Sequence, residues 1–276
     1  MKKDFILKTK KENILRISTF EQNDDKTNLC LIYVHGFKGF KDWGFVPYIG
    51  NYFADRGFFV ITFNFSHNGV GEVLTEFDEL EKFAKNTISL EVEELNEVID
   101  SYTGNYFGER KNKKIGVIGH SRGGAISILA VAQNKSVNSL AVWASVSKLD
   151  RYSEEEKASW RKTGFIVVLN SRTNQKMKLN LDLLQDIENN KNDKLSIEKA
   201  TKYLNRRLLI AHGDKDTSVP FSEAKDLYSW ANNELTSFCE IPGVGHTFDV
   251  VHPFSGSNPK FEMLLEKTNS FFNNYL

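Results

Sequence analysis

A serine between two glycines is the most informative chemical feature of the sequence. Residues 119–123 read Gly-His-Ser-Arg-Gly, which matches G-x-S-x-G with Ser121 at its centre. An apolar run precedes the pentapeptide and a helix-like run follows it, the context that presents a serine hydroxyl as a nucleophile. The glycines allow a tight turn, and the Arg122 amide is predicted to donate to an oxyanion. One alternative is a turn that serves packing alone. The other, a phosphate loop, lacks both the Walker ending and the G-x-G-x-x-G spacing.

A serine hydroxyl is a nucleophile near neutral pH only with a general base, which in turn needs an orienting carboxylate. His246 is the candidate base, because it lies in the loop sequence GVGHTF at 243–248, directly after the last expected strand. His252, six residues later and followed by proline, is the alternative. His212 ends the preceding strand and comes too early in the chain.

The candidate acid is Asp216, in the sequence HGDKDTSVP at 212–220 between an expected strand and an expected helix. Asp214 is expected to close the tight turn by accepting hydrogen bonds from local backbone N–H groups. Asp216 is then better placed to reach over the sheet. Asp249 is a further alternative, although it follows the base in the chain.

The loop after the apolar run 29–34 is expected to supply the second oxyanion donor, through the backbone N–H of Phe37. His35 in the same loop is interpreted as structural, with its ring bonded to loop backbone. Phe40 and Trp43 are candidate substrate-binding residues that would wall an acyl or aromatic pocket. Plain core packing is the alternative for both aromatics.

No metal or cofactor is expected. The sequence contains no H-E-x-x-H, C-x-x-C or C-x-x-x-H pattern, and His67 stands alone in a polar segment. The two cysteines, Cys30 and Cys239, lie in apolar runs and are expected to be buried free thiols. Free thiols are typical of a reducing compartment.

The elements that must position these residues alternate between strand and helix. Short, unbroken apolar strands separated by helices predict a parallel sheet covered on both faces, with its active site at the carboxyl ends of the strands. The polar segment 66–85 is left unassigned. We expect strands at 5–9 and 13–20, paired as a hairpin, and at 29–34, 58–65, 115–118, 140–146, 208–211 and 238–241, with helices at 47–56, 92–102, 125–132, 221–230 and 261–272.

One interval is too long for a simple crossover. About 60 residues separate Val146 from Arg206, roughly twice what a strand-to-strand connection needs. The segment 147–205 is polar but contains apolar runs, so we interpret it as an insertion that packs on the body as a small lid. A disordered surface excursion is the alternative, and it is disfavoured because disorder goes with low hydrophobicity.

Charge and composition exclude several classes of partner. The 276 residues contain 36 Lys plus Arg and 36 Asp plus Glu, so the formal net charge is zero. A protein that binds nucleic acid, or that binds a membrane through a polybasic surface, needs an excess of cations. No apolar stretch approaches the ~18 residues that span a bilayer, and the N-terminus lacks the pattern of a signal peptide. We therefore expect a cytoplasmic, single-domain protein over 1–276, either monomer or homodimer.

The motifs HGF at 35–37, GHSRGG at 119–124, HGDKDTSVP at 212–220 and GVGHTF at 243–248 resemble the α/β-hydrolase superfamily. Within it the pattern is similar to the dienelactone-hydrolase-like and prolyl-oligopeptidase-like branch, and to small bacterial cinnamoyl and feruloyl esterases. The resemblance implies a mostly parallel, eight-stranded α/β-hydrolase fold. It also implies Ser121 as nucleophile, His246 as base and Asp216 as acid, with the amides of Phe37 and Arg122 as the oxyanion hole.

The expected reaction is hydrolysis of small-molecule carboxylic esters, with small or aromatic acyl groups, through an acyl-enzyme on Ser121. A peptidase, a thioesterase or a carbon–carbon hydrolase with the same triad is the nearest alternative. A binding protein that keeps the fold without turnover is the alternative from a different class.

Overall fold

The computed structural model describes residues 1–22, 27–170 and 173–276. In this part of the chain eight strands form one sheet in the order β1-β2-β4-β3-β5-β6-β9-β10, while β7 and β8 form a separate hairpin. Neighbours from β4 to β10 pair in parallel, and β1 and β2 pair antiparallel at one edge. The strands are β1 (Lys2–Lys8), β2 (Ile14–Phe20), β3 (Leu29–Val34), β4 (Phe59–Asn64), β5 (Lys114–His120), β6 (Ser139–Trp143), β7 (Phe165–Asn170), β8 (Gln175–Asn180), β9 (Arg207–Gly213) and β10 (Thr236–Ile241).

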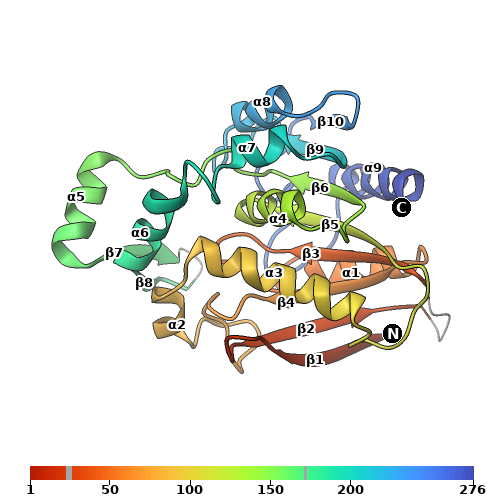
Figure 1. The fold of residues 1–276 in the computed structure, drawn as a ribbon, viewed down its shortest axis with the longest axis horizontal. Helices are drawn as coiled ribbons and strands as arrows, with labels where there is room; N and C mark the ends of the chain where they lie inside the picture. Colours follow the sequence, from red (N-terminus) through yellow and green to blue (C-terminus); the bar gives the residue numbers. More distant parts are fainter. Residues whose placement is uncertain (23–26, 171–172) are drawn as a thin grey trace.

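Helices cover both faces of the sheet, as the unbroken apolar strands predict (Figure 1). Helices α3, α4 and α8 bury their apolar residues on one face, and α1 and α9 bury theirs on the opposite face. This confirms the predicted α/β class and the mostly parallel sheet. The helices are α1 (Val46–Ala54), α2 (Leu80–Ala84), α3 (Ile88–Thr103), α4 (Arg122–Gln133), α5 (Glu154–Thr163), α6 (Leu181–Asn190), α7 (Ile197–Lys202), α8 (Phe221–Trp230) and α9 (Pro259–Tyr275).

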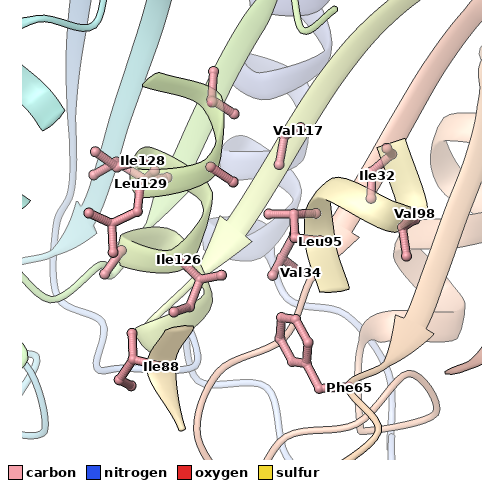
Figure 2. Packing of buried hydrophobic residues seen from close by; sticks show 14 of the residues in the cluster. Ile32, Val34, Phe65, Ile88, Leu95, Val98, Val117, Ile126, Ile128 and Leu129 are labelled. Carbon is pink, nitrogen blue, oxygen red and sulfur yellow. The ribbon is translucent and has the colours of Figure 1, made fainter. Parts of the chain in front are cut away.

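Helices α3 and α4 pack on the central strands of the sheet and form the core of the protein with them. Figure 2 shows Leu95 of α3 and Ile126 of α4 lying over β3 and β5, among residues such as Ile32 and Val117. All four side chains are fully buried. Burial of apolar side chains of this size stabilises the fold by about 1.5–3 kcal/mol each. The strand end that carries Ser121 is therefore held between two packed layers.

The predicted elements agree with the structure except at some boundaries. The predicted helix 221–230 coincides with α8. Strand β6 ends at Trp143, three residues before the predicted end, because Ala144 has a left-handed backbone (φ 47°) that leaves the strand. The unassigned segment 66–85 contains the short helix α2.

The long interval between β6 and β9 contains α5, the β7–β8 hairpin, α6 and α7. Within 147–205, residues 171–172 lie outside the described residues. In the rest, Trp160, Met177 and Leu184 are fully buried and belong to the same hydrophobic cluster as the sheet. Figure 1 shows α5, α6 and the hairpin projecting beyond one end of the sheet. The described part of the insertion is therefore folded onto the body.

No helix in the described ranges combines the length and the apolar character needed to cross a membrane.

A buried carboxyl on α3 has an unusual environment. Glu94 is 2% exposed and accepts hydrogen bonds from the backbone N–H of Ser66 (2.9 Å) and from the Asn13 amide (3.2 Å). The Ser66 hydroxyl also contacts it. Burial outweighs these bonds and raises the pKa of Glu94 to about 7. The folded protein therefore binds this proton at pH values where the unfolded chain has released it.

Glu94→Gln is expected to change how stability depends on pH. The folded pKa lies above the unfolded one, so this carboxyl lowers the free energy of unfolding as pH rises from about 4.5 to 7. The variant should lack that fall, which is worth up to about 3 kcal/mol. Urea unfolding of wild type and variant at pH 5 and pH 8 measures the difference. Glu93→Gln, at an exposed position of the same helix, is the control, and parallel pH profiles for wild type and Glu94→Gln would contradict the assignment.

Candidate active site

Ser121 lies on a strained turn between β5 and α4. Its backbone has φ 58° and ψ −124°, a region that non-glycine residues rarely occupy. A Cβ on Gly119 would come 2.5 Å from the carbonyl of Gly123, and a Cβ on Gly123 would come 2.5 Å from the carbonyl of His35. Both glycines of the pattern are therefore required by contact with backbone atoms that cannot move aside. The turn carries Ser121 at the carboxyl end of β5.

The structure brings Ser121, His246 and Asp216 together in one hydrogen-bonded chain. The Ser121 hydroxyl lies 2.9 Å from Nε2 of His246, and Nδ1 of His246 lies 2.7 Å from Oδ2 of Asp216. An ionised carboxylate only accepts hydrogen bonds, so Nδ1 carries the proton and Nε2 accepts from the serine. Asp216 follows β9 and His246 follows β10, so parallel pairing of these strands places both loops beside Ser121.

Asp216 is a buried carboxylate that remains ionised. Its side chain is fully buried, which alone would raise its pKa. The rings of His212 and His246 and the N–H of Val219 donate to it and hold its pKa well below the usual range. Nε2 of His212 lies 3.2 Å from Oδ2 of Asp216 and donates to the carbonyl of Val219 at 2.9 Å. A second histidine therefore contacts the same carboxylate oxygen as His246.

His120 supports the histidine loop from below. Its Nε2–H donates to the backbone carbonyl of His246 at 3.0 Å, and the two rings lie 4.9 Å apart between centroids. Burial and the neighbouring His246 lower the pKa of His120 to about 3, so the ring is neutral at pH 7. His120, which precedes Ser121 in the chain, thus holds the backbone of His246 in place.

The alternative histidine and carboxylates have other partners. His252 accepts from the N–H of Gly44 at 2.8 Å, and Asp249 accepts from the N–H of Gly245 at 3.0 Å. The prediction that Asp214 bonds local backbone is wrong, because its carboxylate accepts from the N–H of Gly243 at 2.6 Å. The side chain reaches across to the neighbouring loop because β9 and β10 end side by side.

Gly36, which precedes Phe37, and Arg122 both lie next to Ser121. A Cβ on Gly36 would come 2.8 Å from Cβ of Ser121, so the loop that carries Phe37 passes close to the serine. Arg122 is the first residue of α4, where an N–H has no intrahelical acceptor. Within the described residues no backbone carbonyl accepts from either amide.

The side chains of these two residues form one stack. The guanidinium of Arg122 lies 4.5 Å from the centre of the Phe37 ring, and the Phe83 ring stacks on Phe37 at 5.6 Å between centroids. The Arg122 guanidinium donates to the buried carboxylate of Glu91 at 2.6 Å, and Asn86 donates to the same oxygen at 2.7 Å. Helix α3 therefore fixes how Arg122 and Phe37 lie relative to each other.

His35 is placed as the sequence predicts. Its Nδ1–H donates to the carbonyl of Gly36 at 2.9 Å, and its Nε2 accepts from the N–H of Phe65 at 3.4 Å. Burial lowers its pKa to about 4. The neutral ring joins the loop after β3 to the end of β4.

Two cavities lie next to Ser121 and His246, and both are also lined by Phe37 and Lys38. One has a volume of about 310 Å³, and Phe40 and Trp43 are among its lining residues. We call it the aromatic cavity; its lining consists of Tyr33, His35, Gly36, Phe37, Lys38, Gly39, Phe40, Trp43, Val46, His120, Ser121, Asn170, His246 and Thr247. Phe40 is only 1% exposed, so it contributes both to the core and to this wall.

The other cavity, of about 320 Å³, lies between the body and the insertion, and we call it the cationic cavity. Four basic residues contribute to its wall, and α6 of the insertion supplies apolar ones. Its lining consists of Phe37, Lys38, Ile88, Ser121, Arg122, Val146, Lys148, Leu149, Arg151, Tyr152, Leu183, Ile187, Ser218, Val219 and His246.

Three residues at the site were missed by sequence reasoning in the roles the structure gives them: His212, His120 and Glu91. A signal existed for Glu91, because it lies four residues before Leu95 on the apolar stripe of α3, where a carboxylate needs a partner. His120 lies inside the serine motif, but nothing in its type predicts a bond to a loop 126 residues away.

The described residues contain no cluster of three or more His, Cys, Asp or Glu side chains arranged to hold a metal ion. Both cysteines are buried and free.

Comparison with known proteins identifies the family. The model of the prolyl oligopeptidase family matches residues 43–258, which include Ser121, Asp216 and His246. A search of curated proteins finds no match.

Similar solved structures include Est1E from Butyrivibrio proteoclasticus with ferulic acid bound (16% identity, 98% of each chain, TM-score 0.75). The esterase domain of a Rhodothermus marinus protein is also similar (16%, 100% of this chain and 99% of that one, TM-score 0.67). So is dienelactone hydrolase from Anabaena variabilis ATCC 29413 (14%, 100% and 99%, TM-score 0.66). These similarities show the fold, and the family match covers most of the chain. The chain therefore belongs to the prolyl oligopeptidase family and is a hydrolase of the α/β-hydrolase superfamily.

Proposed function

We propose that this hydrolase is a carboxylesterase-like enzyme that cleaves esters of small or aromatic acyl groups through an acyl-enzyme on Ser121. One observation carries the proposal. The Ser121 hydroxyl, the His246 ring and the buried Asp216 carboxylate are linked at 2.9 and 2.7 Å, which is the geometry that activates a serine.

In the proposed reaction His246 takes the proton of Ser121 as the hydroxyl attacks the ester carbonyl. Asp216 orients the ring and stabilises the imidazolium that forms. The amides of Phe37 and Arg122 donate to the oxyanion, assisted by the positive end of α4. His246 then protonates the departing alcohol, and a water molecule activated by the same ring releases the acid.

The aromatic cavity supports the proposed acyl preference. Phe40 and Trp43 line it beside Ser121, and flat apolar walls favour acyl groups without charge. Est1E, which has a similar fold, has been solved with ferulic acid, a hydroxycinnamic acid. We propose cytoplasmic localisation because both thiols are free. A monomer or a homodimer that acts on a small-molecule ester, with no cofactor, completes the proposal.

Ser121→Ala is expected to abolish esterase activity. Without the nucleophile, hydrolysis of p-nitrophenyl acetate should fall on the order of 10⁴-fold or more, and a fluorophosphonate probe should no longer label the protein. Ser136→Ala, on the exposed loop after α4, is the matched control. Full activity of purified Ser121→Ala would falsify the proposal. An intact wild type that neither turns over nor is labelled would indicate a binding protein.

A substrate panel separates the proposed ester preference from related chemistry on the same triad. Acetyl, butyryl, decanoyl and feruloyl esters are compared with a thioester and an aminoacyl p-nitroanilide. We expect the highest kcat/KM on short-chain or feruloyl esters. Faster cleavage of the anilide would favour a peptidase, and activity confined to decanoyl esters would contradict the proposed acyl preference.

Glu91→Gln is expected to lower kcat about tenfold with little change in KM. The carboxylate holds Arg122 at 2.6 Å, and Arg122 holds the Phe37 ring, so loss of the charge loosens both proposed oxyanion residues. The loss should be smaller than the 10²–10³-fold cost of removing one oxyanion donor, because both amides remain. Steady-state kinetics on p-nitrophenyl acetate measures the effect.

Glu93→Gln on the same helix is the control for this change, since Glu93 points to solvent and pairs with Lys11. An unchanged kcat in Glu91→Gln, or an equal loss in both variants, would contradict the positioning role of Glu91.

A further inference from the structure

The two cavities beside Ser121 differ in charge. Among the described residues, Lys38 is the one lysine or arginine that lines the aromatic cavity, whereas Lys38, Arg122, Lys148 and Arg151 all line the cationic cavity. Among the described residues, no aspartate or glutamate lines either cavity. The chain as a whole carries no net charge, so the basic residues are concentrated in the wall of the cationic cavity.

Two of these four basic residues, Arg122 and Arg151, are paired with carboxylates that do not line the cavity. Arg122 pairs with Glu91 at 2.6 Å, and Arg151 pairs with Glu223 at 2.6 Å. Both carboxylates are buried, so they fix the guanidinium groups without entering the cavity. The nearby Asp216 carboxylate is engaged by His246 and His212.

Lys148 is different from the arginines. It is exposed, it lines the cavity, and it follows β6 at the start of the insertion. Its ammonium group makes no hydrogen bond or ion pair with the described residues. Lys38, which lines both cavities, donates to the carbonyl of Leu169 at 3.1 Å. Lys148 therefore gives the cavity a positive charge that no carboxylate of the described residues pairs with.

The remaining walls suit the carbon skeleton of a substrate. Leu149, Leu183 and Ile187 line the same cavity as the basic residues and Ser121. A volume of about 320 Å³ is at the lower end of the range for small-molecule sites. Apolar walls with a few charged groups are typical of a site that orients a small ligand.

We propose that the cationic cavity binds a carboxylate of the substrate, so that the enzyme prefers esters with an acidic group on one side of the scissile bond. The inference rests on the proposed ester hydrolysis at Ser121. The charge attracts and orients the substrate, while the aromatic cavity receives the uncharged side. Exposed ion pairs contribute modestly, so the effect of any single lysine is a few-fold.

Two pairs of isosteric esters test the proposal. Monomethyl adipate and methyl adipamate place a carboxylate or a neutral amide on the acyl side. The pair 4-acetoxybenzoate and 4-acetoxybenzamide does the same on the alcohol side. We expect the wild type to favour the charged member of at least one pair by about fivefold in kcat/KM. Raising NaCl from 0.05 to 0.5 M should reduce this ratio, because salt screens exposed charges.

Lys148→Met is expected to lower the charged-to-neutral ratio about threefold, since methionine keeps much of the length of the side chain but removes its charge. Lys135→Met is the matched control. Lys135 is exposed and follows the far end of α4, about 18 Å along the helix from Ser121. Arg151 is not substituted, because its loss would leave the buried Glu223 without its partner.

Binding without turnover separates this inference from the proposed function. In Ser121→Ala, NMR titration should show tighter binding of the charged ester of the preferred pair, and adding Lys148→Met should remove that difference. Equal kcat/KM within both pairs in wild type, or a ratio that Lys148→Met leaves unchanged, overturns the carboxylate site. If the wild type does not hydrolyse p-nitrophenyl acetate, the proposed function is overturned instead. Binding of the charged and neutral esters to Ser121→Ala then tests the carboxylate site by itself.

Discussion

The left-handed backbone at Ser121 is the constraint on which the rest of the site depends. A parallel strand that passes directly into a helix must reverse within one residue, and Ser121 takes up that reversal with φ 58°. Strain of this kind costs about 1–3 kcal/mol. Helix α4 offsets the cost, because residues 123–131 are all buried. The same turn brings β3 close enough that only glycine fits at position 36, so the loop that carries Phe37 must pass beside the serine hydroxyl.

The second constraint is that His246 lies in a loop and still has to meet Ser121 at hydrogen-bond distance. Backbone contacts from three side chains hold that loop. His120 donates to the carbonyl of His246, Asp214 accepts from Gly243, and Asp249 accepts from Gly245. Asp214 and Asp249, the alternative candidates for the acid, thus hold the loop of the base and do not hydrogen-bond to the His246 ring. Loop order supplied in this way reduces the entropy lost when a substrate is oriented.

Much of this arrangement could be predicted from the sequence, because local rules apply to it. The G-x-S-x-G pattern after an apolar run predicts a strand–turn–helix, and the chain order of Ser121, Asp216 and His246 narrows the candidates to residues that the structure brings together. Contacts that depend on three-dimensional register could not be predicted. The bond of Asp214 to Gly243 and the contact of His212 with Asp216 follow from how β9 and β10 end, which no local pattern encodes. The early end of β6 at Trp143 likewise reflects a turn at Ala144, a residue with no turn signal of its own.

The body of the protein carries the triad, and the insertion lines the cationic cavity. Because of this separation, the net charge of the chain is a poor guide to the substrate. The body supplies the strained turn and the hydrogen-bonded chain from Ser121 to Asp216. The charged groups there have partners within the body: Glu91 pairs with Arg122, and His212 contacts Asp216. The insertion and its entry segment supply Lys148, Leu183 and Ile187 to the cationic cavity. Substitutions there can change which ester is bound without disturbing the bonds that activate the serine. Equal numbers of acids and bases describe the chain as a whole, whereas a ligand in a small cavity responds to the charges on the wall of that cavity. We therefore infer that the selectivity of this hydrolase depends on where its charged residues lie rather than on their sum.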